Sequence, residues 1–363
     1  MSKDKPYWIA FNVFEGIGPL RFGLLLKYFG SAEKAWKASR KELLEIGLGQ
    51  KLTEKFLLFR KSFDFDKYLK RLELLKVSVL TLKDKKYPKL LREIKTAPFV
   101  LYVKGEIQSQ DDKALAVVGT RKVTSYGREV TQVLTRDLVT QGLTIISGMA
   151  RGVDSIAHQT ALKAGGRTIA VLGCGIDIIY PPENRGLYQK ICEKGAVVSE
   201  VPLGKYVTRG IFPARNRIIS GLSLGILVTE GARISGSLIT ASYAGEQGRE
   251  VFAVPGPITS LFSQGPASLI KKGAKLVYNA KDILEELDMR FEVLGSRFEG
   301  RKGETEEERK IIKILQDGNL HIDEIVRKSD LKISQVGSIL SLMEIKGMVK
   351  NFGRMIYGTS KER

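Results

Sequence analysis

Between residues 114 and 256, short apolar runs alternate with longer segments of helical periodicity. Uninterrupted apolar runs of this length are typical of strands buried on both faces of a parallel sheet. The runs are Ala114–Val118, Leu143–Ile146, Thr168–Leu172, Ala196–Ser199, Gly225–Thr229 and Glu250–Val254. This alternation predicts an α/β domain over residues 81–290, built on an extended Rossmann-like, doubly wound parallel sheet.

Each expected strand runs into a short turn, and most of these turns contain glycine. The turns are Gly119–Arg121, Ser147–Gly152, Gly173–Gly175, Glu200–Pro202, Glu230–Ser237 and Pro255–Gly256. In an open α/β sheet such turns meet at the carboxyl edge, where ligands bind. Glycine allows the backbone to approach an anion closely, and helix N-termini supply free N–H donors. Because arginines lie in or beside several turns, we expect a phosphate-bearing polyanion at this edge.

The chain is strongly basic, since 59 Lys and Arg against 40 Asp and Glu give a formal net charge of +19 over 363 residues. More than half of this surplus falls within residues 1–110. Such a positive field favours nucleic acid or another anionic surface through counterion release and steering. A lysine-rich surface with no polyanionic partner is the alternative that charge alone leaves open.

Several other classes of protein lack their sequence signatures here. Cys174 and Cys192 are too few for a disulfide framework or a thiolate metal site, and His158 and His321 have no metal-ligand spacing. The sequence shows no Walker A motif, no secretory signal and no apolar run near the ~20 residues of a membrane helix. We therefore expect a cytoplasmic protein with no metal, no other cofactor and no membrane segment.

Residues 1–80 are predicted to form a helical domain. Two of its loops, 15–19 and 45–50, place an apolar residue between glycines at the start of a helix. This pattern resembles a SAM-like or helix-hairpin-helix module, whose backbone N–H groups can meet a phosphate. Plain helix-to-helix turns in a small bundle explain the glycines equally well.

The C-terminal part is expected to form a domain of its own. Residues 291–306 are charged and punctuated by glycine, which indicates a linker. Residues 307–363 contain three helical segments followed by a β-hairpin pattern, an arrangement that resembles a winged helix. The nearly balanced charge of this domain leaves contact with DNA and contact with protein both open.

The first turn of the expected sheet differs from a dinucleotide site. A dinucleotide fold would show G-x-G-x-x-G there and an acidic residue about 20 positions later. The chain has Gly119-Thr120-Arg121-Lys122 instead. An arginine in this turn favours a phosphate or a stacked base over NAD. Arg151, in the next turn, adds a second guanidinium at the same edge.

The loop between the strands expected at 199 and 225 carries arginines around an aromatic ring and an amide, namely Arg209, Phe212, Arg215, Asn216 and Arg217. This mixture suits single-stranded nucleic acid, because bases stack on the ring while guanidinium groups hold phosphates. The alternatives are that Phe212 packs into the core and that Arg215 pairs with a carboxylate such as Glu230. Asn216 either touches the ligand or caps the local backbone.

Ser235-Gly236-Ser237 opens a helix, where it either binds a phosphate or simply caps the helix. Asp154 and Glu230 lie at the same edge, but no nucleophile is spaced to accompany them, and Asp154 is expected to cap its helix. His158 is expected to be a structural histidine.

Five strings of the sequence together resemble the DNA-processing protein A family, also called DprA or Smf. They are Ala116–Arg121, Ser147–Asp154, Phe212–Ser223, Ser235–Ala241 and Gly248–Gly256. Their order agrees with the family over residues 85–290, and the third string reads F-P-A-R-N-R-I-I-S-G-L-S. The flanks fit as well, since many members have a SAM-like N-terminal domain and a winged-helix C-terminal domain.

The resemblance implies a non-enzymatic, sequence-tolerant binder of single-stranded DNA. Such a protein protects DNA during natural transformation, loads RecA recombinase onto it and works as a homodimer. Matching positions imply that Arg121 and Arg209 contact phosphates, that Phe212 abuts a base, and that the stretch Arg215–Arg217 lines or supports the pocket. Further DNA contacts are expected from residues of the turns, namely Gly119, Thr120, Lys122, Arg151, Ser235, Gly236 and Ser237.

The resemblance also implies a dimer surface over Gly265–Leu276, with Leu269, Ile270 and Leu276 as its apolar residues. Many members show G-T-N where this chain has Gly265-Pro266-Ala267. The rival interpretation is a Rossmann-type nucleotide-processing enzyme similar to the LOG phosphoribohydrolases. Those enzymes show a P-G-G-x-G-T-x-x-E string, which this sequence lacks.

Overall fold

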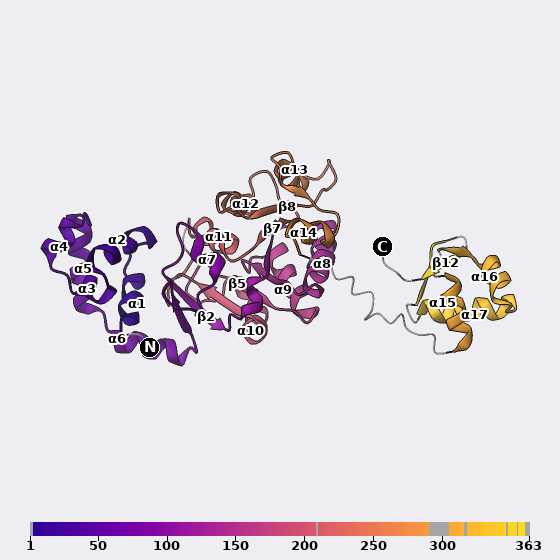
Figure 1. Cartoon of the computed structure of the whole chain (residues 1–363), viewed down its shortest axis with the longest axis horizontal. Coiled ribbons are helices and arrows are strands. Elements are labelled where there is room, and N and C mark those ends of the chain that lie inside the picture. Colours follow the sequence, from indigo (N-terminus) through magenta and orange to yellow (C-terminus); the bar gives the residue numbers. More distant parts are fainter. Residues whose placement is uncertain are drawn as a thin grey trace. The chain divides into compact units, whose positions relative to one another are not determined.

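The computed structural model describes residues 3–207, 210–289, 305–315, 318–345, 348–353 and 355–359. The chain divides into two compact units, Met1–Phe291 and Glu292–Arg363 (Figure 1). The first unit holds a bundle of helices and a nine-stranded sheet, and the second holds a small helical domain with a three-stranded sheet. Most of the linker expected at 291–306 lies outside the described residues.

The N-terminal bundle consists of α1 Lys5–Val13, α2 Pro19–Phe29, α3 Ala32–Lys37, α4 Arg40–Glu45, α5 Gln50–Ser62 and α6 Phe65–Leu74. The two glycine loops separate α1 from α2 and α4 from α5, as predicted. The sequence analysis missed the breaks before α3, α4 and α6. At each of them a side chain, Ser31, Ser39 or Asp64, accepts a hydrogen bond from a backbone N–H of the first turn. Such N-caps let a new helix start in a new direction. The SAM-like resemblance of the bundle stays a prediction.

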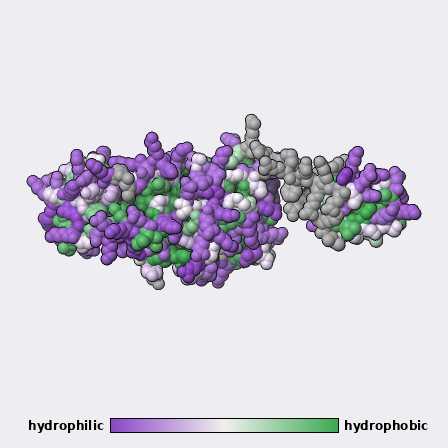
Figure 2. Space-filling view, turned by 90° about the horizontal axis from the view of Figure 1, so that it is seen from below, coloured by the Kyte–Doolittle hydropathy of each residue, from purple (hydrophilic) through white to green (hydrophobic). Residues whose placement is uncertain are grey.

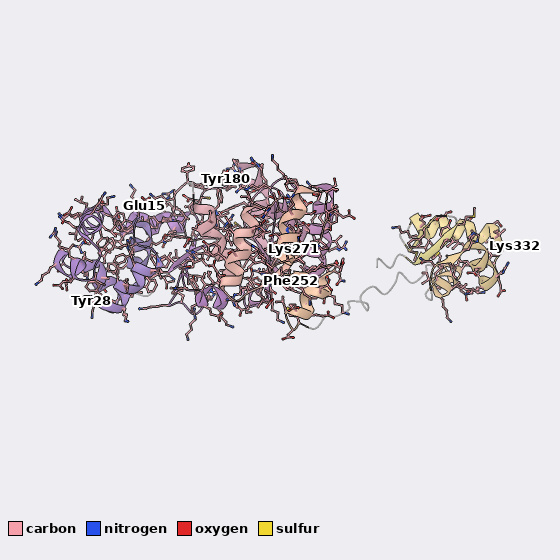
Figure 3. All side chains as sticks on the ribbon, turned by 90° about the horizontal axis from the view of Figure 1, so that it is seen from above. Glu15, Tyr28, Tyr180, Phe252, Lys271 and Lys332 are labelled. Carbon is pink, nitrogen blue, oxygen red and sulfur yellow. The ribbon has the colours of Figure 1, made fainter. Side chains whose placement is uncertain are left out.

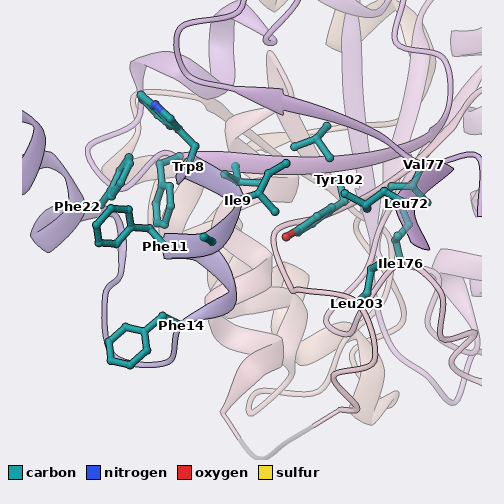
Figure 4. Close-up of a cluster of buried hydrophobic side chains, with 14 of the residues drawn as sticks. Trp8, Ile9, Phe11, Phe14, Phe22, Leu72, Val77, Tyr102, Ile176 and Leu203 are labelled. Atoms are coloured by element: carbon teal, nitrogen blue, oxygen red, sulfur yellow. The ribbon is translucent and has the colours of Figure 1, made fainter. Parts of the chain in front are cut away.

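Aromatic rings fill the centre of the bundle (Figure 4). Phe11 stacks on Phe56, with ring centroids 5.2 Å apart, and meets Trp36 edge-on at 5.5 Å. Such offset and edge-to-face pairs add to the free energy gained by burying the rings. The same buried cluster continues through Tyr102 and Leu203, which belong to the sheet and its loops. The bundle and the sheet therefore share one core.

The nine strands are β1 Ser78–Thr81, β2 Val100–Gly105, β3 Ala114–Val118, β4 Thr144–Ser147, β5 Thr168–Val171, β6 Ala196–Ser199, β7 Gly225–Val228, β8 Glu250–Ala253 and β9 Lys275–Leu276. Their order is β1-β2-β6-β5-β4-β3-β7-β8-β9, and β3 to β9 are parallel. The chain moves outward from β3 to β6 and then returns to β7 on the other side of β3. This topology confirms the doubly wound sheet and sets its switch point between β3 and β7.

Residues 78–105 add two antiparallel strands to the β6 side of the sheet. Strand β2 pairs antiparallel with β6, and β1 pairs antiparallel with β2. Strand β2 takes up the backbone donors and acceptors that β6 would otherwise leave unpaired at the edge. The parallel sheet is thus protected at that side by an antiparallel pair.

Helices cover both faces of the sheet. They are α7 Lys89–Glu93, α8 Ser125–Thr140, α9 Val153–Lys163, α10 Arg185–Lys194, α11 Ile211–Gly221, α12 Gly236–Glu246, α13 Gln264–Ile270 and α14 Ala280–Glu286, with 3-10 turns η1 Ser109–Asp112, η2 Pro182–Asn184 and η3 Leu261–Ser263. On β3, Leu115 and Val117 pack with residues of α8 and α9, while Ala116 and Val118 pack with residues of α11 and α12. This is the two-residue period of a strand buried on both sides.

The second unit contains α15 Glu306–Ile314, α16 Ile322–Ser329, α17 Ile333–Ile345, β10 Leu320–His321, β11 Val349–Asn351 and β12 Ile356–Thr359. The three strands form an antiparallel sheet in the order β10-β12-β11. The core of this unit contains the buried side chains of Ile311, Ile325, Val336 and Leu340. Three helices and a hairpin confirm the expected winged-helix architecture. Helix α17 carries no lysine or arginine.

His158 lies fully buried on α9, as expected of a structural histidine. Its Nδ1 is 2.6 Å from the Thr168 hydroxyl oxygen, and that hydroxyl donates its only proton to the Ile145 carbonyl oxygen at 2.7 Å. The ring therefore donates from Nδ1. Burial, reinforced by the nearby Arg215 guanidinium, lowers the pKa of His158 to about 3. The folded protein thus holds this ring neutral.

This neutral histidine predicts a loss of stability in mild acid. The unfolded chain protonates His158 below the ordinary pKa of 6.5 while the folded chain does not, so lowering the pH from 7 to 5 favours unfolding by about 2 kcal/mol. The variant His158→Asn keeps a side-chain N–H for Thr168 and cannot titrate. Urea unfolding at both pH values should show a smaller decrease in the variant. An equal decrease in both proteins would contradict the assignment.

Candidate nucleic-acid interface

A pocket lies where the carboxyl ends of β3, β4 and β5 meet the start of α11. Its lining includes Arg121 after β3, Arg151 after β4, Cys174 after β5, and Tyr180, Phe212 and Arg215. Three of the predicted turns therefore converge on one site.

Gly152 brings the first two of these turns together. It has φ +77°, and a Cβ atom there would lie 2.3 Å from the carbonyl oxygen of Thr120. The next residue, Val153, donates its backbone N–H to the same oxygen at 3.2 Å. Only glycine tolerates both this backbone conformation and this approach. The turn after β4 can therefore lie directly against the turn after β3.

Two exposed guanidinium groups lie at the mouth of the pocket. The guanidinium carbon of Arg121 is 5.1 Å from the centroid of the half-buried Phe212 ring, which is the geometry of a cation–π contact. Arg151 forms an exposed ion pair with Glu183. Both cations remain open to solvent on one side, where a phosphate can approach them.

Arg215 has a different role, because the whole residue is buried and only 5% of its surface is exposed to solvent. Its guanidinium donates hydrogen bonds to the carbonyl oxygens of Gly148, at 2.7 Å, and Val171. Burial lowers the pKa of Arg215, and the Asp154 carboxylate opposes that shift. Arg215 therefore joins the ends of β4 and β5 and forms the floor of the pocket. It does not pair with Glu230, the carboxylate named as its alternative partner.

Asp154 folds back onto the turn before its helix. Its carboxylate accepts hydrogen bonds from the backbone N–H groups of Gly148 and Ala150 at 3.1 and 3.3 Å. The expectation of a helix cap is wrong, because the N-cap position of α9 is Gly152. Burial raises the pKa of Asp154, and the Arg215 guanidinium counters this effect. The two buried charges thus stabilise the same turn from opposite sides.

Asn216 and Arg217 support the pocket from behind. Asn216 accepts a hydrogen bond from Arg215 Nε at 3.0 Å and donates one to the Gly236 carbonyl oxygen at 3.2 Å. Arg217 is buried and forms an ion pair with Glu200 at the end of β6. Neither side chain belongs to the pocket lining. Their contacts fix α11 against α12 and β6.

Glu230 closes the anion site that a dinucleotide fold would use. Its carboxylate accepts hydrogen bonds from the Thr124 backbone N–H at 3.0 Å and from the Thr124 hydroxyl at 2.6 Å. It thus occupies the N-terminus of α8, where such a fold binds pyrophosphate. A Cβ atom at Gly127 would lie 2.0 Å from Oε2, so glycine is required there. The turn after β3 therefore has no open phosphate site at α8.

The other residues predicted to contact DNA differ in how accessible they are. Gly119 and Thr120 are held close to the Glu230 backbone, whereas Lys122 is exposed. Ser235 caps α12 by accepting the Ser237 backbone N–H at 3.3 Å, which favours the capping interpretation of Ser235–Ser237. Arg209 lies outside the described residues.

The sequence analysis missed Tyr180 and Glu183. Tyr180 lies in the loop after β5, and Glu183 lies in η2, the 3-10 turn that leads into α10. An aromatic residue in a loop at the carboxyl edge was the available signal, but nothing in the sequence showed that the loop returns to the pocket.

Among residues 3–207, 210–289 and the described parts of the second unit, no cluster of three or more His, Cys, Asp or Glu side chains suits a metal ion. Within the same ranges, no helix has the length and apolar character needed to cross a membrane. Figure 2 shows hydrophilic residues over most of the visible face, with hydrophobic patches between them.

The fold and the pocket together define a doubly wound α/β protein with an arginine–aromatic site and a winged-helix domain. Residues 78–288 match the family model described as DNA recombination-mediator protein A, and residues 301–351 match the DprA winged helix domain. The chain belongs to the DNA recombination-mediator protein A family.

Relatives and solved structures agree with this placement. Protein Smf of Synechocystis is 35% identical over 98% of this chain and 99% of its own length. The crystal structure of DprA from Streptococcus pneumoniae covers 80% of this chain and 99% of its own, with 34% identity and a TM-score of 0.69. A structure of DprA from Helicobacter pylori was reported for its single-stranded DNA binding mode. It covers 59% of this chain and 98% of its own, with 31% identity and a TM-score of 0.53.

Replacing the buried and the exposed arginine should change stability by very different amounts. Arg215→Met leaves two buried carbonyl groups without their guanidinium donor and the Asp154 carboxylate without its opposing charge, which is expected to cost about 3–5 kcal/mol. Arg121→Ala removes an exposed side chain and its cation–π contact, and should change the free energy of unfolding by no more than about 1 kcal/mol. Urea unfolding of both variants measures the difference. Equally small effects would contradict a structural role for Arg215.

Proposed function

We propose that this protein binds single-stranded DNA at the carboxyl-edge pocket, acts as a recombination mediator and is not an enzyme. One observation carries the proposal: two exposed guanidinium groups, those of Arg121 and Arg151, share a pocket with the aromatic rings of Tyr180 and Phe212. Guanidinium groups hold phosphates, and aromatic rings stack on the bases of unpaired strands.

The same chemistry supports binding with little sequence preference. Every base has a face that can stack on a ring, so rings and phosphate contacts do not select a sequence. The Asn216 amide lies outside the pocket lining, and its hydrogen bonds are made to Arg215 and Gly236. We place the DNA contacts in the first unit, where the exposed Arg121 and Arg151 share a pocket with two aromatic rings.

The carboxylates near the pocket support a binding role over catalysis. Asp154 and Glu230 are buried, and each accepts hydrogen bonds that fix the backbone of a turn. Release of free base from nucleoside monophosphates by the purified protein would instead favour a phosphoribohydrolase. The Helicobacter pylori relative, reported as a single-stranded DNA binder, also supports the proposal.

The cations at the pocket mouth predict how salt affects binding. Arg121→Ala should weaken binding to oligo-dT by about 1–3 kcal/mol, the range for hydrogen bonds to charged groups. It should also reduce the slope of log K against log salt by about 0.7 per lost phosphate contact. Fluorescence anisotropy over a salt series measures both quantities. Arg136→Ala, an exposed arginine near the C-terminal end of α8, is the matched control.

The variant Glu183→Gln tests the same site, and it should strengthen DNA binding where Arg121→Ala weakens it. This change releases Arg151 from its ion pair while keeping a side chain of the same size. Because exposed ion pairs contribute up to about 1 kcal/mol, affinity for oligo-dT should rise by up to about fivefold and the salt slope should steepen. Unchanged affinity in both Arg121→Ala and Glu183→Gln would remove the DNA contacts from this pocket.

We further propose that the protein is a homodimer through Gly265–Leu276. Ile270 and Leu276 are half-buried at this end of the sheet, while Leu269 packs partly against the core. Light scattering should give a mass equal to two chains. The variant Ile270→Arg should reduce the measured mass to that of a single chain. Leu74→Arg, an exposed leucine of the bundle, is the control. A monomeric mass for the unaltered protein would contradict the dimer.

RecA recombinase is the protein partner that we propose, with the cytoplasm as the site of action. The support is family membership, together with a pocket suited to a strand that RecA would later cover. The measurement is RecA ATPase activity on single-stranded DNA precoated with a single-strand-binding protein. Stimulation by this protein is expected, and its absence would restrict the proposal to DNA binding.

A further inference from the structure

We infer that Tyr180 is a second base-stacking surface of the pocket, next to Phe212. This inference rests on the proposed binding of single-stranded DNA and assigns a ligand contact to a residue beyond the arginine–phenylalanine loop. It would allow the pocket to hold two neighbouring bases.

The relative position of the two rings excludes a clamp around one base. Their centroids are 6.1 Å apart and their planes are tilted by 39°. A base inserted between two rings needs about 7 Å, twice the ~3.5 Å of a carbon–carbon contact. The rings therefore present neighbouring surfaces, and each can take its own base.

Tyr180 is the more accessible of the two rings. It is 43% exposed and lies at the molecular surface in Figure 3. Phe212 is half-buried, and the guanidinium carbons of Arg121 and Arg215 lie 5.1 and 5.8 Å from its centroid. The cations thus limit access to Phe212, while Tyr180 keeps a larger free surface.

Local hydrogen bonding does not explain why Tyr180 is at the surface. Its side chain is exposed, and its hydroxyl has no hydrogen-bond partner among the described residues. An aromatic side chain held out beside exposed guanidinium groups is the arrangement that unpaired bases use. Arg151, which lines the same pocket, can hold the phosphate beside a base stacked on Tyr180.

The loop that carries Tyr180 is fixed before any ligand binds. Asp177 accepts the Gly204 backbone N–H at 2.9 Å and a hydrogen bond from Arg71 of α6 at 2.6 Å. Gly175 donates its backbone N–H to the Lys205 carbonyl oxygen at 2.8 Å. These contacts join two loops of the sheet domain to the helical bundle. A preordered ring loses little conformational entropy when a base stacks on it.

Base-free DNA separates stacking from phosphate binding. We compare Tyr180→Ala, Tyr180→Leu and Tyr180→Phe with the unaltered protein, using oligo-dT and an oligonucleotide of equal length made of abasic sites. Loss of the ring should weaken binding to oligo-dT by about 5- to 150-fold, with the salt slope unchanged. Binding to the abasic strand should hardly change, and Tyr180→Phe should behave like the unaltered protein.

A fluorescent base provides an independent measurement. An oligo-dT with 2-aminopurine at successive positions should be quenched on binding at two neighbouring positions. One of these should recover in Tyr180→Ala and Tyr180→Leu. Tyr28→Ala, an exposed tyrosine of α2, is the matched control and should change nothing.

The outcomes distinguish this inference from the proposed function. If the unaltered protein does not bind single-stranded DNA, the proposed function and the role of Tyr180 are both wrong. If it binds them while Tyr180→Ala and Tyr180→Leu keep full affinity and both quenched positions, only the role of Tyr180 is overturned. Equal losses on oligo-dT and on the abasic strand would likewise overturn stacking. Far-UV circular dichroism confirms that each variant is folded.

Discussion

The buried guanidinium of Arg215 is the interaction on which the pocket depends. It donates hydrogen bonds to carbonyl groups at the ends of β4 and β5 and lies opposite the Asp154 carboxylate, which holds the turn after β4. A buried charge is stable only when hydrogen bonds and an opposing charge replace its hydration. Because these partners come from three segments, the pocket forms only when α11, β4, β5 and α9 are all in place.

The carboxylate of Glu230 explains why the binding site differs from that of a dinucleotide fold. It occupies the N-terminus of α8 through Thr124, so the usual phosphate position is filled from within the protein. The open cations lie farther along the edge, at Arg121 and Arg151, beside two aromatic rings. The fold therefore keeps the ligand edge of a Rossmann sheet while presenting a site suited to a strand with exposed bases.

Much of the fold followed from local patterns in the sequence. Uninterrupted apolar runs placed β3 to β8 within a residue or so at each end, because strands buried on both faces tolerate few polar residues. The sequence analysis missed the N-caps at Ser31, Ser39 and Asp64, since these residue types are equally common in ordinary loops. It also missed the pairing of β2 with β6, which joins segments far apart in the chain.

The sequence by itself determined that arginines and glycines gather at one edge of a parallel sheet, because the strand pattern fixes where each turn falls. Only the tertiary structure decided which arginines face solvent. Arg121 and Arg151 do, whereas Arg215 and Arg217 are enclosed and bonded to distant groups. Only the tertiary structure placed Tyr180 beside Phe212, because this position depends on how the loop that carries Tyr180 folds back. Burial and hydrogen-bond partners arise from contacts between remote segments, which local patterns do not encode.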